Sequence, residues 1–358
     1  MRSRGAGQAN VFRRGPAAAH VKVVDGARGE GGGQVARLAL ALAAATGTPT
    51  TVENVRANRE QPGLKAGHVA AFRALAQLCD GTVEGADLGS TRVTLRPGAT
   101  VGGEHRFAIE TAGPVTLLAQ ALLPACVAAR QPFTLHLQGG TNVAWAPQWD
   151  DYARVHLPLL RRLGIEAEPA LARRGFFPQG GGEVTLEVAT PTLAPASFDE
   201  AGEVRAIHAV VASHGLPTHV VDRAKSAILD ALPAARIEVD AHRGPGTGFA
   251  VSLRAECRHG ILGADAVGRK GVRVEQVIEG AAAALKAELT SGAGVDVHQA
   301  DQLPVFLALA GGGSYTARML SLHARTVLEM LPEFLPVRVE VRHEARKVHV
   351  ILARGADR

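Results

Sequence analysis

Hydrophobic residues in the first third of the chain follow two spacings, one typical of strands and one typical of helices. A short strand-like run leads through a glycine-rich turn into a strongly apolar helical stretch, and a second strand, a second helix and a hairpin follow. The expected ranges are strand 21–24, helix 38–45, strand 49–55, helix 67–78 and hairpin strands 81–84 and 91–95. This pattern predicts one β-α-β-α-β-β unit, in which two helices cover one face of a four-stranded sheet.

The same order of elements occurs twice more. The second unit is expected in strand 105–109, helix 112–129, strand 133–138, helix 149–163 and strands 165–168 and 183–188. From residue 302 the order appears once more, with helix 302–310, strand 314–319, helix 323–331 and strands 337–342 and 347–352. We therefore predict an α+β fold of three β-α-β-α-β-β repeats, the last of them broken.

The break lies near residues 192–200, where Pro191, Pro195 and Ser197 indicate a polar loop. The following segment does not match the repeat, and its pattern predicts strands 204–212, 236–240 and 249–256 with helices 218–232 and 272–289. The predicted organisation is a repeat body of residues 20–199 and 294–358, interrupted by a small inserted α/β domain of residues 200–293.

Composition narrows the class of protein. The 358 residues are 46% hydrophobic and 20% charged, which is usual for a globular protein, and no apolar run is long enough to span a membrane. We therefore expect no membrane partner, and the three cysteines, which stand singly in the sequence, predict a cytoplasmic protein. Four arginines near the start supply most of the net charge of +5, and we expect residues 1–19 to form a disordered basic tail. Because the remaining chain is nearly neutral, contact with nucleic acid requires a local basic site.

The glycine-rich turn between Asp25 and Arg37 is the first candidate for chemistry. Backbone N–H groups at a helix start attract anions, and glycines let a ligand approach them closely. The turn lacks the Lys-Ser/Thr pair of a Walker P-loop and the spacing of a dinucleotide-binding fingerprint. Glu30, and Arg37 about one helical turn after Gln34, suit a site for metal and phosphate. They also suit a tight turn with two solvated charges, and the turn alone does not decide.

Two loops are also open to more than one interpretation. Arg56 and Arg59 follow the second strand, where guanidinium groups suit phosphate but are equally common on a solvated surface. The loop at 139–149 contains both tryptophans of the chain, Trp145 and Trp149, which suit either a sandwiched base or packing beneath the loop.

The same holds for three further stretches. His68 at a helix start is either a catalyst or a structural histidine. Residues 298–302 open a helix, with Asp301 expected as its cap. His323 is either a cap-region residue or a nucleophile, since neutral imidazole attacks phosphorus readily. Three successive glycines at 180–182 indicate a close approach of backbone or ligand. These patterns do not name the reaction.

Four strings taken together make the chain similar to a known family. They are Asp25-Gly…Glu30-Gly-Gly-Gly-Gln34…Arg37, Arg56-Ala-Asn-Arg59…Pro62-Gly-Leu64, Gly139-Gly-Thr-Asn142 and Arg174-Gly-Phe-Phe-Pro-Gln-Gly-Gly-Gly182. In this order they resemble the RNA 3′-terminal phosphate cyclase family, from about residue 20 to 355. The resemblance implies a body of three repeats, related to the fold of enolpyruvyl transferases, with a small inserted domain.

The resemblance also implies a three-step, ATP-dependent reaction at an RNA end. A histidine attacks the α-phosphorus of ATP, which gives a histidine–AMP intermediate and pyrophosphate. AMP then passes to the RNA 3′-phosphate to give RNA(3′)pp(5′)A, and the neighbouring 2′-hydroxyl displaces AMP to leave a 2′,3′-cyclic phosphate. The implied partners are ATP, Mg²⁺ or Mn²⁺, and an RNA with a 3′-phosphate, and a homodimer is an open alternative.

Matched position by position, the family's nucleophile falls on His323 and its metal-contacting acid on Glu30. The positions for phosphate and the RNA end are Gln34, Arg37, Arg56, Arg59 and His68. The nucleotide positions are Gln120, Pro147, His298, Gln299, Ala300, Asp301 and Gln302. Three positions depart from the common pattern: Gly67 replaces Gln, Val327 replaces Asn, and His298 replaces an aromatic residue that stacks on adenine opposite Pro147.

Two alternatives fit the same repeat count. A non-cyclising branch of the family, which serves ribosome biogenesis, keeps the fold but lacks the nucleophile, so His323 argues against it. An enolpyruvyl transferase would share the repeats but has no reason to carry the string from Arg174 to Gly182.

Overall fold

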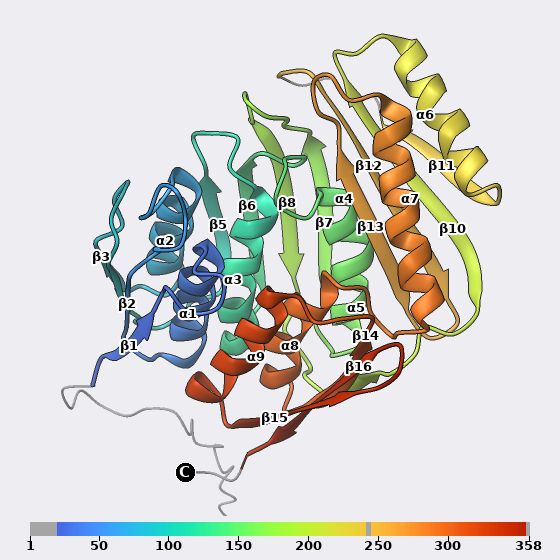
Figure 1. Cartoon of the computed structure of the whole chain (residues 1–358). Coiled ribbons are helices and arrows are strands. Elements are labelled where there is room, and N and C mark those ends of the chain that lie inside the picture. The colour runs from blue at the N-terminus through green and yellow to red at the C-terminus, as the bar shows by residue number, and fades with distance from the viewer. Residues whose placement is uncertain (1–19, 241–244, 356–358) are drawn as a thin grey trace, which may run out of the picture.

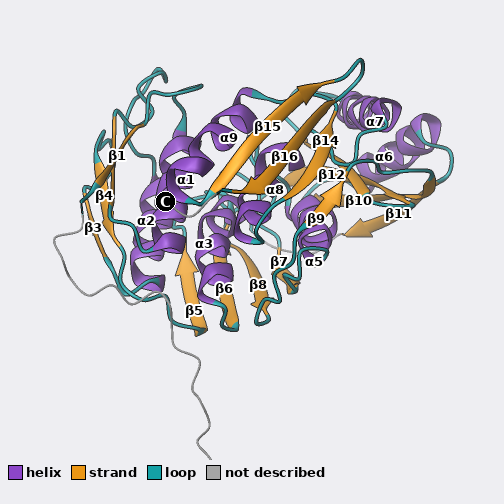
Figure 2. Ribbon diagram, turned by 90° about the horizontal axis from the view of Figure 1, so that it is seen from below, coloured by secondary structure: helices purple, strands orange, loops and turns teal. Residues whose placement is uncertain are grey.

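The computed structural model describes residues 20–240 and 245–355, and within them it contains four four-stranded sheets together with helices (Figure 1). Three sheets surround a central group of helices, and the fourth lies to one side with two helices of its own (Figure 2). The α+β fold expected from the sequence is confirmed. The tail predicted for residues 1–19 lies outside the described residues.

The first repeat has the predicted order of elements. It contains β1 (Lys22–Asp25), α1 (Gly33–Thr46), β2 (Thr50–Glu53), α2 (Ala66–Leu78), β3 (Thr82–Glu84) and β4 (Val93–Arg96). In space the strands follow the order β1-β2-β4-β3, with β1 and β2 parallel and the other pairs antiparallel. Helix α1 is rich in Ala and Leu, both strong helix formers, and it ends at Gly47 in the left-handed conformation (φ 67°).

The second repeat reproduces this topology. It contains β5 (Gly103–Ala108), α3 (Val115–Ala129), β6 (Phe133–Gly139), β7 (Ala167–Arg173) and β8 (Gly182–Val188), in the spatial order β5-β6-β8-β7. Its second helix consists of α4 (Trp149–Asp151), a π-helical turn (Tyr152–His156) and α5 (Leu157–Arg161) without interruption. Such turns frequently lie at functional sites, and His156 within this one reaches the wall of the cleft described below.

The third repeat has its first strand before the insert, at residues for which the sequence predicted a polar loop. It contains β9 (Ala196–Phe198), α8 (Gln299–Leu309), β14 (Gly313–Ala317), α9 (Leu322–Phe334), β15 (Val337–His343) and β16 (Val348–Arg354), in the order β15-β16-β14-β9. The segment expected as a polar loop therefore contains β9, which pairs with β14 in parallel. The strand is three residues long and buries only the side chain of Phe198, so it leaves no alternation in the sequence.

The inserted segment forms the fourth sheet. It contains β10 (Val204–His214), α6 (Thr218–Ala231), β11 (Ala235–Asp240), β12 (Gly248–Cys257), β13 (Ile261–Val267) and α7 (Val274–Ser291), with the strand order β11-β10-β12-β13. Strand β13 was not predicted. A separate apolar cluster, which includes Ile228, Val251 and Ile278, joins this sheet to its helices. Division of the chain at residues 200 and 293 into two domains stays a prediction.

Helices from all three repeats pack together at the centre of the molecule. Helix α1 contacts α2, α3 and α9, and α8 contacts α3 and α9 (Figure 2). Because α1 has neighbours on several sides, its residues from Leu38 to Ala44 are all buried. None of the helices in the described ranges is both long and apolar enough to cross a membrane.

Candidate active site

A cleft of about 930 Å³ lies where these helices meet, and the insert forms part of its wall. It brings together most of the predicted site residues from all three repeats. Those that line it are Glu30, Gln34, Arg37, Arg56, Arg59, His68, Gln120, Pro147, His298, Asp301, Gln302 and His323. Gln299 and Ala300 do not line the cleft, because both are buried behind it.

The glycine turn before α1 makes room for other side chains at the start of this helix. A Cβ on Gly33 would lie 2.0 Å from Nε2 of His68, so only glycine allows the imidazole to lie against the helix start. His68 Nδ1 accepts a hydrogen bond from the backbone N–H of Lys65 (3.1 Å). Burial lowers the pKa of His68 to about 3, and the charges of Arg37, Arg56 and Lys65 act in the same direction. The ring is therefore neutral at pH 7, with its proton on Nε2 as a hydrogen-bond donor.

His323 stands at the first turn of α9. Ser321 caps this helix by accepting a hydrogen bond from the backbone N–H of Ala324 (3.0 Å). Glu30 Oε2 lies 2.6 Å from His323 Nε2, and Glu30 Oε1 lies 2.7 Å from a guanidinium nitrogen of Arg59. One carboxylate thus fixes both a histidine of the third repeat and an arginine of the first.

The three arginines of the predicted phosphate site differ in what they contact. Arg56 donates to the carbonyl oxygens of Gln61 and Gly63 (2.8 Å each), so it shapes its own loop. Arg59 is paired with Glu30. Arg37 makes no hydrogen bond or ion pair with any residue of the described ranges, and burial lowers its pKa to about 10. It is still charged at neutral pH, which makes it the arginine best able to receive an anion.

Polar contacts fix the opposite part of the cleft. The hydroxyl of Thr116 donates to the carbonyl oxygen of Pro147 (2.9 Å), and the Gln120 side-chain amide donates to Gln302 Oε1 (2.7 Å). Of the two tryptophans, Trp145 is 91% exposed beside the cleft, whereas Trp149 is 3% exposed. Trp149 therefore packs in the core, and the two rings do not form a sandwich for a base.

Asp301 does not cap α8, which corrects that prediction. Asp296 Oδ1 accepts hydrogen bonds from the backbone N–H groups of His298 and Gln299 (3.0 and 2.9 Å) and so satisfies the start of the helix. Asp301 lies in the first turn, where burial raises the pKa of its carboxyl to about 7, although the charges of His298 and Arg37 oppose the shift.

The insert contributes cleft residues that the sequence did not predict. Asp265, Val267 and Arg269 come from β13 and the residues after it. Asp265 Oδ2 accepts a hydrogen bond from the backbone N–H of Gln148 (2.8 Å), and the Arg269 guanidinium lies 5.8 Å from the centre of the Trp145 ring. These contacts hold the loop that carries Pro147 against the insert.

Comparison with known proteins assigns the chain to a family. Residues 28–341 match the family model described as RNA 3′-terminal phosphate cyclase. Three similar proteins bear the name RNA 3′-terminal phosphate cyclase. That of Nitrosospira multiformis is 40% identical over 335 residues, which cover 91% of this chain and 95% of that protein. That of Koribacter versatilis is 38% identical (96% and 98% covered), and that of Methanopyrus kandleri is 39% identical (89% and 94% covered). The chain belongs to the RNA 3′-terminal phosphate cyclase family.

Proposed function

We propose that this chain is an ATP-dependent RNA 3′-terminal phosphate cyclase that works through a histidine–AMP intermediate. The observation that carries the proposal is the position of His323, which lines the same cleft as Arg37 and is held by Glu30 at 2.6 Å. An imidazole nucleophile in the same cleft as a guanidinium group that makes no hydrogen bond within the described residues suits nucleotidyl transfer, because the cation offsets charge on the phosphate during attack. Family membership supports the same reaction.

In the first proposed step, adenine lies between Pro147 and His298, and the amides of Gln120 and Gln302 face the same part of the cleft. The imidazole of His323 attacks the α-phosphorus of ATP. A nitrogen–phosphorus bond forms, and the bond to the β-phosphate oxygen breaks, releasing pyrophosphate. Arg37 and the N-terminus of α1 are the groups proposed to receive the phosphate oxygens.

Glu30 is the carboxylate proposed to hold a divalent metal. In residues 20–240 and 245–355, no three His, Cys, Asp or Glu side chains are arranged to hold a metal by themselves. A lone carboxylate still fits Mg²⁺ or Mn²⁺, since Mg²⁺ is commonly held by one or two carboxylates together with substrate phosphates. When bound, the ion would offset charge on the triphosphate and on the leaving pyrophosphate. The position of Glu30 beside His323 supports the proposal, because a metal held there would lie next to the triphosphate that His323 is proposed to attack.

The second and third proposed steps use the same phosphate-binding groups. An oxygen of the RNA 3′-phosphate attacks the phosphorus of His323–AMP, and the bond to nitrogen breaks. The 2′-hydroxyl then attacks the activated 3′-phosphorus, and AMP leaves. Neutral His68 donates a hydrogen bond and Arg37 supplies charge, so together they hold the terminal phosphate. The 2′-hydroxyl is already adjacent, so the last step gains from proximity.

Incubation with ATP labelled at the α-phosphate tests the proposal. Wild-type protein should form an acid-labile protein–AMP adduct, and the His323→Ala variant should form none and should not cyclise RNA. His343→Ala, which changes an exposed histidine at the end of β15, serves as the matched control. A normal yield of adduct in His323→Ala would contradict the assignment of the nucleophile. Absence of adduct in the wild-type protein would favour the non-cyclising branch of the family.

Three expectations about the whole protein also stay proposals. We propose a cytoplasmic location, and a homodimer remains an open prediction. We further propose that residues 200–293 form a domain within the repeat body. The separate apolar cluster of the fourth sheet supports this division.

A further inference from the structure

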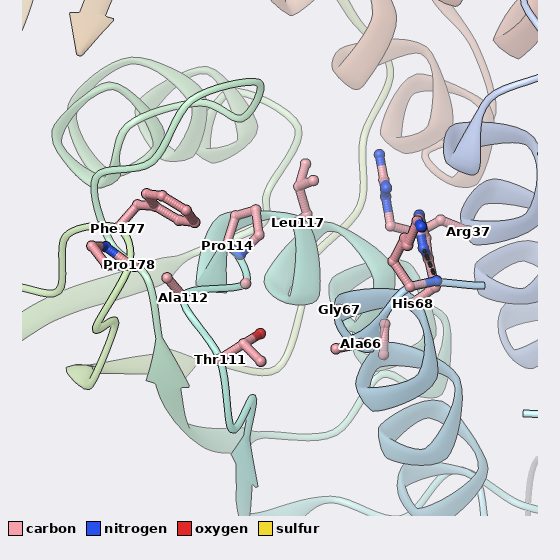
Figure 3. Close-up of a pocket in the computed structure, with 13 residues that line it drawn as sticks. Arg37, Ala66, Gly67, His68, Thr111, Ala112, Pro114, Leu117, Phe177 and Pro178 are labelled. Atoms are coloured by element: carbon pink, nitrogen blue, oxygen red, sulfur yellow. Dashed lines mark hydrogen bonds between the residues drawn. The ribbon is translucent and has the colours of Figure 1, made fainter. Parts of the chain in front are cut away.

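A second cavity, of about 500 Å³ (Figure 3), adjoins the cleft proposed for ATP. The two cavities share the side chains of Arg37, His68 and Leu117. The residues proposed to bind adenosine line only the larger cleft. The second cavity therefore begins at the proposed phosphate-binding groups and has a different set of walls.

The walls of this cavity are mostly apolar side chains and backbone. Figure 3 shows Phe177 and Pro178 at one end, Leu117 in the middle, and Arg37 with His68 at the other end. The side chain of Phe177 is 73% exposed, whereas that of the preceding Phe176 is 2% exposed and packs with residues of the insert. An exposed aromatic ring at one end of a cavity, with a guanidinium group and a hydrogen-bond donor at the other, suits a ligand with a flat apolar part and an anionic part.

Glycines of the string after Arg174 explain how Phe177 reaches this position. The backbone N–H of Gly180 donates to the carbonyl oxygen of Phe176 (2.8 Å) and closes the turn. Gly180 has φ 64°, and a Cβ there would lie 2.8 Å from Cα of Ala112. Glycine therefore lets the loop lie directly on the segment before α3, which forms the floor of the cavity.

Gly67 leaves space in the same cavity. This residue of α2 lines the cavity, and a Cβ there would meet no atom within 4 Å. Glycine in place of the family's common glutamine at this position therefore widens the cavity beside His68. No close contact in this structure requires glycine here.

We propose that the second cavity binds the 3′-terminal nucleoside of the RNA, with its base against Phe177 and Pro178 and its 3′-phosphate at Arg37 and His68. This proposal rests on the proposed cyclase function. RNA(3′)pp(5′)A consists of two nucleosides joined through a pyrophosphate, so its halves need two cavities that meet at one phosphate-binding point. The cavities meet at Arg37 and His68, and the second one offers the apolar surface that a base requires.

Recognition in this cavity uses the face of the base and not its edge. Apart from the shared Arg37 and His68, the polar side chains that line the cavity are those of Lys65 and Thr111. Stacking on an aromatic ring tolerates every base, because each base has a π-face. The enzyme should accordingly accept RNA with any of the four bases at its 3′ end.

The test compares Phe177→Ala with the wild-type protein on two RNAs that carry a 3′-phosphate, one with an ordinary terminal base and one with an abasic terminal residue. Phe177→Ala should raise KM for the ordinary RNA about tenfold. The abasic RNA should already bind the wild-type protein more weakly, and Phe177→Ala should weaken it no further. Phe177→Tyr, which keeps the ring, should restore the KM for ordinary RNA.

Leu88→Ala is the matched control, because Leu88 is 71% exposed and lies outside both cavities. A second variant, Gly67→Trp, places a large side chain into the cavity and should raise KM for the ordinary RNA at least as strongly. An unchanged KM in Phe177→Ala, or an equal loss with both RNAs, would overturn the proposal. Formation of the His323 adduct in the wild-type protein keeps this outcome separate from a failure of the cyclase function.

Discussion

The two adjoining cavities differ in the groups that line them. The larger cleft has charged and amide side chains from three repeats and the insert among its apolar residues, whereas aliphatic side chains, backbone and the ring of Phe177 line most of the smaller cavity. Fixed donors and acceptors select one ligand by its edges, whereas an apolar surface accepts the face of any base. Under the proposed function, this difference would make the site selective for ATP and tolerant of RNA sequence, with Arg37 between the cavities serving both.

The strongest test of this comparison is Arg37→Met, because Arg37 lines both cavities. We expect the rates of adduct formation and of RNA cyclisation each to fall about a hundredfold, as is usual for loss of a charge-assisted hydrogen bond to phosphate. Both rates are measured under single-turnover conditions. Arg73→Met, which changes an exposed arginine of α2, is the control. A loss confined to one step would show that the cavities do not share this cation.

A smaller effect is expected from Glu30→Gln. Because Glu30 lines only the larger cleft, this substitution should affect the step proposed there and spare the later step. The variant should form the His323 adduct about tenfold more slowly, and additional metal should partly restore the rate. Cyclisation of RNA that already carries the 3′-pp-A end should fall much less, because no pyrophosphate leaves in that step. Glu60→Gln changes an exposed carboxyl in a nearby loop and is the control. Equal losses in both steps, together with a lower melting temperature, would make Glu30 structural.

His156, which lines the larger cleft, should make the free energy of unfolding depend on pH. This ring is buried between Tyr152 and Phe306, and burial lowers its pKa from 6.5 to about 4. Between these values the unfolded chain binds more protons, so the free energy of unfolding falls as the pH drops, by about 2 kcal/mol at pH 5. His68 acts in the same direction.

His156→Gln should therefore reduce the difference in melting temperature between pH 7.5 and pH 5. The exposed His343→Gln should leave that difference as in the wild-type protein. An unchanged acid dependence in His156→Gln would show that this histidine is protonated in the folded state.

The smallest effect is expected from deletion of residues 1–19. The segment carries four arginines, but every residue proposed to bind the RNA end lies elsewhere in the chain, so KM for RNA at physiological salt should stay nearly unchanged. KM is compared at two salt concentrations for the full-length and shortened chains. A large rise in KM at low salt alone would show that the segment contacts RNA and that the cavities do not account for all of the binding.

The sequence predicted helices and strands whose hydrophobic periodicity is strong. It missed short strands that form only because a neighbouring strand pairs with them. Helices such as α1 have enough length to show their pattern, but β9 forms only because β14 lies beside it. Strand β13 was missed, and the contribution of Asp265 and Arg269 was missed with it. No local signal identifies these two residues, because the packing of the insert brings them to the cleft.

The site residues could likewise be predicted where a sequence motif identifies them, but not where a contact in the folded chain decides their role. The family strings named residues that meet in one cleft although they are far apart in sequence, such as Glu30 and His323. Hydrogen bonding could not be predicted in this way. Arg56 and Arg37 read alike in the sequence, yet one is bound to backbone carbonyls and the other is not. The prediction of Asp301 as the cap failed for the same reason, since Asp296, which makes the cap, is of the same residue type.

The long separation of β9 from the rest of its sheet has a consequence for the order of events during synthesis. β9 ends at Phe198, and its partner β14 begins only at Gly313. At roughly 5–20 residues per second, the ribosome makes β9 on the order of ten seconds before its partner strand exists. The insert has time to fold in that interval, while β9 waits unpaired. Because His323 follows β14, the proposed nucleophile is made only after the first two repeats, the insert and β14, so a nascent chain cannot take up AMP on His323 before these parts have been synthesised.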